Sequence, residues 1–285
     1  MSKAFHLVIL GADNPVGRAV TDQAQKSEIS LHAIRSSDWD FTDAPAILEK
    51  LKERGPSFLI NCMSPAEQGT TAASASALSQ ACSALNIGMV QLSSNNVFAG
   101  QEGESFNEDD APAPETPAGQ LTLSVETAIR SSCQRHVIVR IGWLFSSQGE
   151  DDVSKLLELA QQESQLQLSD SKILCPTSAC DVAAVLLAMV NQLRYADLWG
   201  TYHYCSAEQT SLFKFAEVVV AEARQHEDLQ VEGIGSDASH NMNSIFSESS
   251  PKIASKKVLY TFGIKPKPWR QALSRIMKTR YSLDG

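Results

Sequence analysis

The sequence lacks the features that mark a membrane or secreted protein. No apolar run reaches the roughly 18 residues that a helix needs to cross a bilayer, and the N-terminal MSKAFHLVIL has no small-residue cleavage site. The apolar part of this segment reads as a first strand. We therefore expect no membrane partner and a cytoplasmic location.

Clustered metal ligands and an excess of positive charge are also missing. The six histidines and six cysteines are scattered, and no two cysteines form a C-x-x-C pair. We expect no bound metal, and buried thiols in a reducing compartment. The formal net charge of -9 and the pI of about 5.2 argue against a nucleic-acid partner.

Two residue types are absent over long stretches. There is no tyrosine before Tyr195, and there is no lysine between Lys52 and Lys155. Chemistry that depends on a Tyr–Lys pair in this part of the chain is therefore excluded, whatever the fold.

What the sequence does contain, up to about residue 145, is an alternation of short apolar strands with helix-length segments. This order predicts right-handed βαβ units and a Rossmann-type, doubly wound parallel α/β sheet, which binds ligands beyond the carboxyl ends of its strands. The expected strands are 5–10, 29–35, 57–63, 88–94 and 136–145, and the expected helices are 15–26, 44–55 and 74–86.

The remaining chain is less regular. Helices are expected at 153–162, 181–193, 212–223 and 269–277, and strands at 173–177 and 200–206. Residues 101–119 form an acidic, Pro- and Gly-rich surface loop. Residues 235–256 are polar and turn-rich, and 252–257 is expected to be a solvated face. We expect a nucleotide-binding domain over 1–148, to which 178–202 returns, and a smaller C-terminal lobe built from 149–177 and 203–285.

The stretch GADNPVG, directly after the first strand, is a candidate phosphate loop. Gly11 can take the positive φ of a tight turn, and Gly17 permits close packing of the helix on the sheet. Asn14 stands where a middle glycine is usual. Asparagine tolerates left-handed backbone angles, so we expect the turn to survive with a side chain that crowds the phosphates. The loop, with Asp13 and Val16, is either a cofactor site or a structural strand–helix turn.

The end of the second strand carries Arg35, Ser36 and Ser37, with no acidic residue at its tip. An acid there favours the ribose hydroxyls of NAD, whereas Arg and Ser suit a 2′-phosphate. We therefore expect NADP in preference to NAD; an exposed arginine at a strand end is the alternative.

Several segments together point to one family. They are SDWDFTD, FLINCMSPAE, QLSSNNVFAGQEGESFNEDDAPAPETPAG, HVIVRIGWLF, GTYHYCS and FGIKPKPWRQAL. In this order the sequence resembles the dTDP-4-dehydrorhamnose reductases of the extended short-chain dehydrogenase/reductase superfamily, over essentially its whole length.

The resemblance implies a cofactor domain and a smaller lobe that closes over a sugar nucleotide. It places adenine near Asp40 and Phe41, and Trp143 against the sugar, with a half-buried structural aromatic as the alternative. It places the nicotinamide side of the cofactor near Cys62, Met63 and Ser64.

The resemblance also shows what is missing. The family reduces a 4-keto sugar with hydride from NAD(P)H, using a tyrosine as proton donor, a lysine four residues later and a Ser or Thr hydroxyl. Ser94 matches the hydroxyl. Ala118 occupies the tyrosine position and Thr122 the lysine position, while Gly119 and Glu126 fit the family pattern and fix the register.

We therefore expect a degenerate family member that binds a nucleotide or a sugar nucleotide, or regulates a protein partner, alone or as a homodimer. Two alternatives stay open. One is an active NADP-dependent reductase of a 4-keto nucleotide sugar with a non-standard acid. The other is a ligand-free scaffold, which Asn14 and Met63 favour and which Arg35 and Trp143 speak against.

Overall fold

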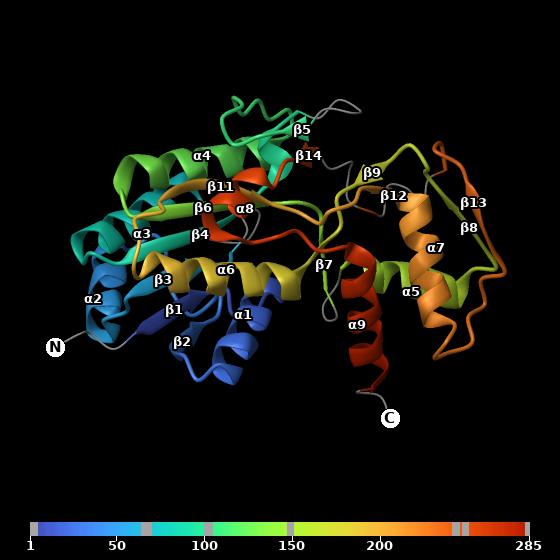
Figure 1. Cartoon of the computed structure of the whole chain (residues 1–285), viewed down its shortest axis with the longest axis horizontal. Coiled ribbons are helices and arrows are strands. Elements are labelled where there is room, and N and C mark those ends of the chain that lie inside the picture. The colour runs from blue at the N-terminus through green and yellow to red at the C-terminus, as the bar shows by residue number, and fades with distance from the viewer. Residues whose placement is uncertain are drawn as a thin grey trace.

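The computed structural model describes residues 5–63, 70–99, 105–146, 151–240, 246 and 251–282. Figure 1 shows a layered α/β unit and, beside it, a smaller lobe that contains helices α5 (Asp152–Gln162), α7 (Leu212–Ala223) and α9 (Trp269–Ser282). The predicted fold class is confirmed.

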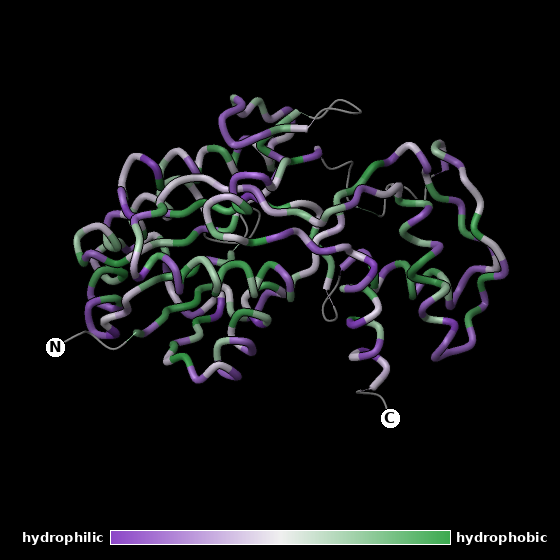
Figure 2. The backbone as a smooth tube through the Cα atoms, viewed as in Figure 1, coloured by the Kyte–Doolittle hydropathy of each residue, from purple (hydrophilic) through white to green (hydrophobic). Residues whose placement is uncertain are grey.

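The larger unit is built on one six-stranded sheet in the order β11-β6-β4-β3-β1-β2, in which all neighbouring strands are parallel. Its inner strands are apolar on both faces, because helices cover both sides; Figure 2 shows this as green segments in the sheet. The strands are β1 (His6–Leu10), β2 (Ser30–Ile34), β3 (Phe58–Asn61), β4 (Gly88–Ser94), β6 (His136–Ile141) and β11 (Gly200–Tyr204).

Two groups of helices form the outer layers. One face of the sheet is covered by α1 (Pro15–Lys26), α6 (Ala179–Leu193) and α8 (Lys256–Phe262). The other face is covered by α2 (Ala44–Arg54), α3 (Ala72–Ala84) and α4 (Pro117–Ser132). Side chains from each group pack on opposite faces of the same strands, so the sheet carries two separate hydrophobic cores.

The smaller lobe has a core of its own. Helices α5 (Asp152–Gln162), α7 (Leu212–Ala223) and α9 (Trp269–Ser282) pack with the parallel pair β8 (Gln165–Leu168) and β13 (Gly233–Ser236). Phe215 and Trp269 are among its most deeply buried side chains. The limits of the two expected domains stay a prediction.

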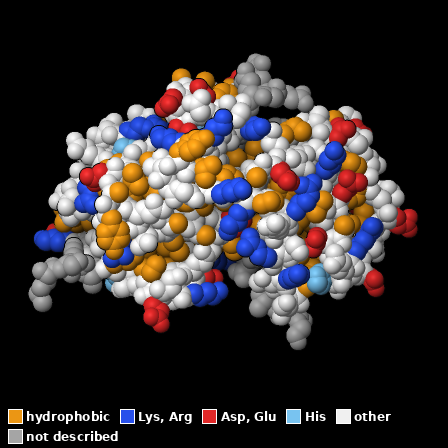
Figure 3. Space-filling view, viewed as in Figure 1, with side chains coloured by type: hydrophobic (Ala, Val, Ile, Leu, Met, Phe, Trp, Pro, Cys, Tyr) orange, Lys and Arg blue, Asp and Glu red, His pale blue; other side chains and the backbone are white. Residues whose placement is uncertain are grey.

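A buried carboxylate links the two units. Asp181, in the first turn of α6, accepts hydrogen bonds from Lys267 Nζ and Arg275 Nη2, each at 3.1 Å. Figure 3 shows Lys and Arg side chains gathered along the junction between the lobes. Ion pairing across this junction therefore holds α9 against the end of α6.

Some short elements differ from expectation. The segment 235–256 is not only turns, because it contains β14 (Lys252–Ile253) and the start of α8. The solvated face expected at 252–257 includes the buried side chain of Ile253. The loop expected over 101–119 ends earlier, since Thr116 caps α4. The short elements that we did not expect are β5 (Ser105–Phe106), which pairs with β14 (Lys252–Ile253), η1 (Asn95–Val97), β12 (Thr210–Ser211), β8, β13 and α8.

Two further expectations concern the burial of the cysteines and the presence of a membrane-spanning helix. All six cysteines are free; five are buried, but Cys180 is exposed, so the expectation of buried thiols is wrong for that residue. Among the described residues, no helix combines the length and the apolar character that a membrane crossing requires.

Candidate nucleotide site

The turn after β1 needs glycine at two positions. Gly11 has φ +72°, in the left-handed region that side chains disfavour. A Cβ on Gly17 would lie 1.9 Å from the Gly11 carbonyl oxygen, so α1 can approach the turn only without one. The predicted tight turn and close helix packing are therefore confirmed.

Asn14 behaves differently from the expectation of a left-handed residue. Its backbone is extended, with φ −90° and ψ 166°, and it is the N-cap of α1. Its Oδ1 accepts from the Gly17 N–H at 2.8 Å, and its Nδ2 donates to the Cys62 carbonyl oxygen at 2.8 Å. The turn thus survives because Gly11 alone supplies the positive φ, and Asn14 is held by two hydrogen bonds.

The first turn of α1 has few N–H groups to offer an anion. A helix N-terminus binds phosphate through N–H groups that lack intrahelical partners. Here Pro15 has no N–H, Gly17 donates to the Asn14 side chain, and Arg18 donates to the Asn14 carbonyl. Within the part of the chain that the structure describes, Val16 is the first-turn residue whose N–H remains available, while its side chain is buried in the core.

The crevice beside this turn is crossed by side chains. β1 lies between β2 and β3, so the gap between β1 and β3 at their carboxyl ends is the topological switch point where such sheets bind ligands. The Asn14–Cys62 hydrogen bond spans this gap. Both Asn14 Nδ2 and Met63 Cγ lie within 3 Å of the position that a Cβ on Gly11 would take. In this arrangement the residues do not fit the pyrophosphate of a dinucleotide.

The residues that follow β3 and line this crevice are buried and have mainly structural roles. Cys62 and Met63 are each 2% exposed, and the Met63 N–H donates to Asn61 Oδ1 at 3.2 Å. Ser64, which we expected beside the nicotinamide, lies outside the described residues.

The carboxylate of Asp13 lies at the tip of β2, although β2 has no acidic residue of its own there. Asp13 reaches over from the glycine turn and accepts from both the N–H and the Oγ of Ser36, at 2.8 and 2.9 Å. Partial burial raises the pKa of Asp13, but the hydrogen bonds from Ser36 outweigh it and the pKa falls below its usual value. Sequence reasoning missed this contact, because the two residues belong to different loops.

Arg35 and Ser37 at the same tip are exposed. The Arg35 N–H donates to Asp38 Oδ2 at 2.9 Å, and its guanidinium lies 3.8 Å from the same carboxylate. Arg35 is thus near an anion of its own chain. Its role in holding a 2′-phosphate stays a prediction.

Of the two residues expected near adenine, Asp40 is exposed and Phe41 is buried. Asp40 is exposed, and its carboxylate accepts from the Thr42 N–H and Oγ1, which lowers its pKa. Phe41 is 4% exposed and packs beside Trp39 in the core under α2. The Phe41 ring is therefore part of the hydrophobic core.

The structure brings Ser94 and the start of α4 together. A Cβ on Gly119 would lie 2.2 Å from the carbonyl oxygen of Asn96, two residues after Ser94. Ala118 is exposed at this end of the helix, whereas Thr122 is buried and donates through Oγ1 to the Ala118 carbonyl at 2.8 Å. Ser94 Oγ itself accepts from the Asn96 N–H at 3.2 Å.

Behind this surface lies a buried ionic network. Glu126 accepts two hydrogen bonds from Arg140, from Nε at 2.9 Å and Nη2 at 2.7 Å, a third from Ser93 Oγ at 2.6 Å and a fourth from Arg130 Nη2 at 2.6 Å. Burial raises the pKa of Glu126, but the contacts with Arg140 outweigh it, and the net direction is downward. Arg140 also lies 3.3 Å from His203 Nε2. Glu126 was singled out from the sequence, whereas Ser93, Arg140 and His203 of the same network were not.

The aromatic residue of the expected sugar site is buried. Trp143 is 8% exposed, donates through Nε1 to Asp152 at 2.9 Å, and meets Phe215 edge-on in the core of the smaller lobe. A structural role is therefore established for it, and packing on a sugar stays a prediction. Tyr202 and Tyr204 are core residues, and the Tyr202 hydroxyl donates to the Leu198 carbonyl.

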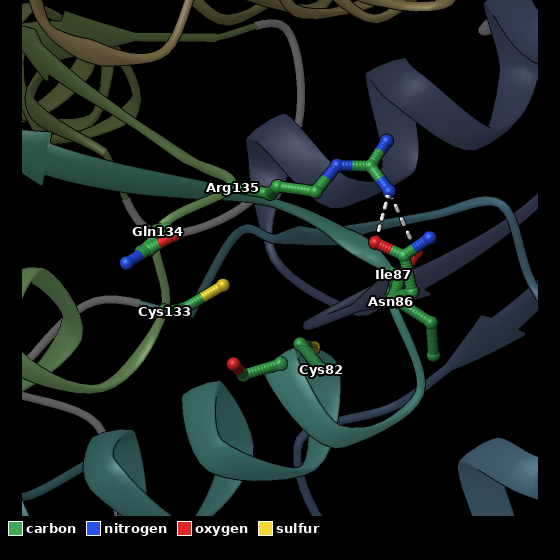
Figure 4. A pocket seen from close by; sticks show the side chains of 7 residues that line it. Cys82, Asn86, Ile87, Cys133, Gln134 and Arg135 are labelled. Atoms are coloured by element: carbon green, nitrogen blue, oxygen red, sulfur yellow. Dashed lines mark hydrogen bonds between the residues drawn. The ribbon is translucent and has the colours of Figure 1, made fainter.

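A separate cavity of about 170 Å³ lies at the opposite edge of the sheet, before the amino ends of β4 and β6. Figure 4 shows Arg135 reaching from one side to the Asn86 side chain, with Cys82 and Cys133 facing the same space. Because ligands of such sheets bind at the carboxyl ends of the strands, this cavity does not belong to the candidate site.

The parallel sheet, the glycine turn at its carboxyl edge and the added lobe define a Rossmann-type α/β protein of two units. Residues 5–282 match the family described as RmlD substrate binding domain, and the chain belongs to this family.

Known relatives match most of the chain. The dTDP-4-dehydrorhamnose reductase of Sinorhizobium fredii is 22% identical over 287 residues, which cover 96% of this chain and 97% of the relative. The Escherichia coli K12 reductase is 26% identical, covering 78% of this chain and 79% of the relative.

Solved structures share the fold. A dTDP-4-dehydrorhamnose reductase of Bacillus anthracis in complex with NADP has a TM-score of 0.84 at 20% identity, covering 99% of this chain and 100% of the other. MoeE5 in complex with UDP-glucuronic acid and NAD has a TM-score of 0.78 at 17% identity, covering 97% and 99%.

Proposed function

We propose that this chain is a nucleotide- or sugar-nucleotide-binding or regulatory member of its family that does not carry out the standard ketone reduction. Its relatives are reductases, and homologous structures hold NADP, or NAD with a nucleotide sugar. The ligand that we propose for this chain is accordingly NADP or NAD, and a protein partner or a second copy would receive the regulatory signal.

The observation that carries the proposal is the pair Ala118 and Thr122 on the helix next to Ser94. Ketone reduction requires a proton donor for the developing alkoxide. Ala118 has no acidic proton, and the Thr122 hydroxyl is buried and already donates to the helix backbone. No tyrosine precedes Tyr195, and Tyr202 and Tyr204 are packed in the core.

A turnover assay tests this directly. NADPH oxidation with dTDP-4-dehydrorhamnose would be followed for this chain beside the Sinorhizobium fredii reductase. Because loss of a general acid alone lowers rates about 10²- to 10⁴-fold, we expect kcat/KM at least about 10²-fold below that of the relative. Comparable turnover would establish the alternative of a reductase with a non-standard acid, and Ser94→Ala would then show whether the remaining hydroxyl carries it.

A ligand-free scaffold is the second candidate, and one observation favours it. Asn14 and Met63 occupy the crevice that a dinucleotide would enter. Calorimetric titration of cofactor-stripped protein with NADPH, with NADH as comparison, separates the two candidates. Micromolar binding of either nucleotide would eliminate the scaffold, and absence of binding both by wild type and by variants with a smaller side chain at position 14 would eliminate nucleotide binding.

A further inference from the structure

The Asn14 side chain ties the glycine turn to the segment that follows β3. Its carboxamide uses both ends: Oδ1 accepts from Gly17 on α1, and Nδ2 donates to the Cys62 carbonyl after β3. We propose that this side chain is a latch that closes the crevice between β1 and β3, so that a dinucleotide binds well only when Asn14 is removed or displaced. The inference rests on the proposed nucleotide-binding function.

The first argument is competition for the same N–H group. A phosphate at the start of α1 would be bound by N–H groups of the first turn and by the positive end of the helix dipole. The Gly17 N–H already has a partner 2.8 Å away in the Asn14 side chain, and Pro15 provides none. Removing the Asn14 side chain would therefore double the number of available first-turn donors, from Val16 alone to Val16 and Gly17.

The second argument is occupied space. In such a turn the second glycine, which Asn14 replaces here, is the position where the backbone approaches the pyrophosphate. In this chain Asn14 Nδ2 lies 2.6 Å, and Met63 Cγ 2.9 Å, from the position of a Cβ on Gly11. The space beside the turn is thus taken by two side chains of the protein itself. Of these, Met63 is unbranched and can change rotamer, whereas Asn14 is fixed by two hydrogen bonds.

The third argument is that the latch can be removed without disrupting the helix. Asn14 is an N-cap with extended backbone angles, and glycine is an acceptable N-cap that costs little relative to asparagine. Asn14→Gly should therefore leave α1 formed while it opens the crevice. Asn14→Ser keeps a capping oxygen but is too short to reach Cys62, and so provides a second opening variant.

The experiment is a calorimetric titration of wild type, Asn14→Gly, Asn14→Ser and Asn14→Asp with NADPH and with NADH. We expect Asn14→Gly to bind at least one of them tenfold or more tightly than wild type, and Asn14→Ser to shift the same way. Asn14→Asp has nearly the same shape but places a carboxylate in the crevice, so it should show no gain. Ser211→Gly removes the corresponding N-cap of α7 in the smaller lobe and should bind as wild type does.

Each outcome decides the proposal. Equal affinities for wild type and Asn14→Gly would overturn the latch and leave nucleotide binding intact. A gain of the same size in Asn14→Asp would also overturn it, because loosening of the loop would then be the cause. No binding by wild type or by either opening variant would overturn the latch and the nucleotide-binding role together. The turnover assay separately decides whether the chain is a reductase.

Discussion

Glu126 and Arg140 face each other through two parallel hydrogen bonds, of 2.7 and 2.9 Å, at a site where both side chains are almost fully buried. The pair joins α4 to β6 beneath the surface that carries Ser94. This carboxylate is therefore a structural group that positions α4, and it is not available as a proton donor.

Breaking this pair should be costly, because a buried charge would be left without its partner. We expect Glu126→Gln to lower the free energy of unfolding by about 3–5 kcal/mol, measured by urea denaturation at pH 7. Glu49→Gln is the matched control, since it breaks an ion pair with Lys52 in which both side chains are more than half exposed. It should change stability by less than about 0.5 kcal/mol. A loss below about 1 kcal/mol for Glu126→Gln would contradict this role.

His203 should make stability fall in mild acid. Burial, followed by the nearby charge of Arg140, lowers the pKa of this histidine to about 3 from its ordinary value of 6.5. Between these pH values the unfolded chain binds a proton that the folded chain does not, so stability is lost as pH falls below about 6.5. Between pH 7 and pH 5 this amounts to about 2 kcal/mol.

Replacing the histidine should remove this pH dependence. In urea titrations at pH 7 and pH 5, His203→Gln should lose about 2 kcal/mol less than wild type over the interval. The range lies above the ordinary pKa of Glu126, which therefore does not contribute. His226→Gln, at an exposed position, should follow wild type. If His203→Gln showed the wild-type slope, the buried neutral histidine would not be its source.

The packing of α1 on the glycine turn should not tolerate a methyl group at Gly17. Because the added Cβ would lie 1.9 Å from the Gly11 carbonyl oxygen, the helix would have to move away from the sheet. We expect Gly17→Ala to lower the free energy of unfolding by about 1–3 kcal/mol. Gln25→Ala, at an exposed position of the same helix, should stay within about 0.5 kcal/mol of wild type. Thermal and urea unfolding of both variants would check this.

The junction between the lobes should weaken when Asp181 loses its charge. Asp181→Asn removes the buried anion that accepts from Lys267 and Arg275, and hydrogen bonds to charged groups contribute about 1.5–3 kcal/mol each. Since both cationic side chains are about half exposed, we expect a total loss of about 1–2 kcal/mol. Glu208→Gln, which breaks only the exposed pair with Arg270, is the control. Urea unfolding would measure both, and equal effects would contradict a special role for Asp181.

The fold could be predicted from the sequence because its main elements leave strong local signals. Strands such as β1 and β4 are buried on both faces and appear as continuous apolar runs, and Gly55 ends α2 with left-handed backbone angles. The two-residue strands β5 and β14 have no period to detect, and they form only because distant segments meet.

The candidate site could be predicted from the sequence only where the absence of a residue type decided the question. A missing tyrosine is visible without any geometry, whereas the conformation of Asn14 depends on the Cys62 carbonyl 48 residues away. The Asp13–Ser36 contact is likewise a product of folding. Trp143 and Phe41 were expected beside a ligand but are buried. An aromatic residue in a sequence does not reveal whether its ring faces a ligand or the core.

The core of the smaller lobe has a consequence for biosynthesis. It takes residues from three separated parts of the chain, and the last of them, α9, provides Trp269, Leu273 and Met277. Until α9 has emerged from the ribosome, Phe215 and α7 pack on Trp143 and α5 but lack the cover that Trp269 and the rest of α9 provide. The sheet can form earlier, since all but α8 of its covering elements precede Cys205, so the nascent protein carries an incomplete lobe on a folded one until α9 has been made.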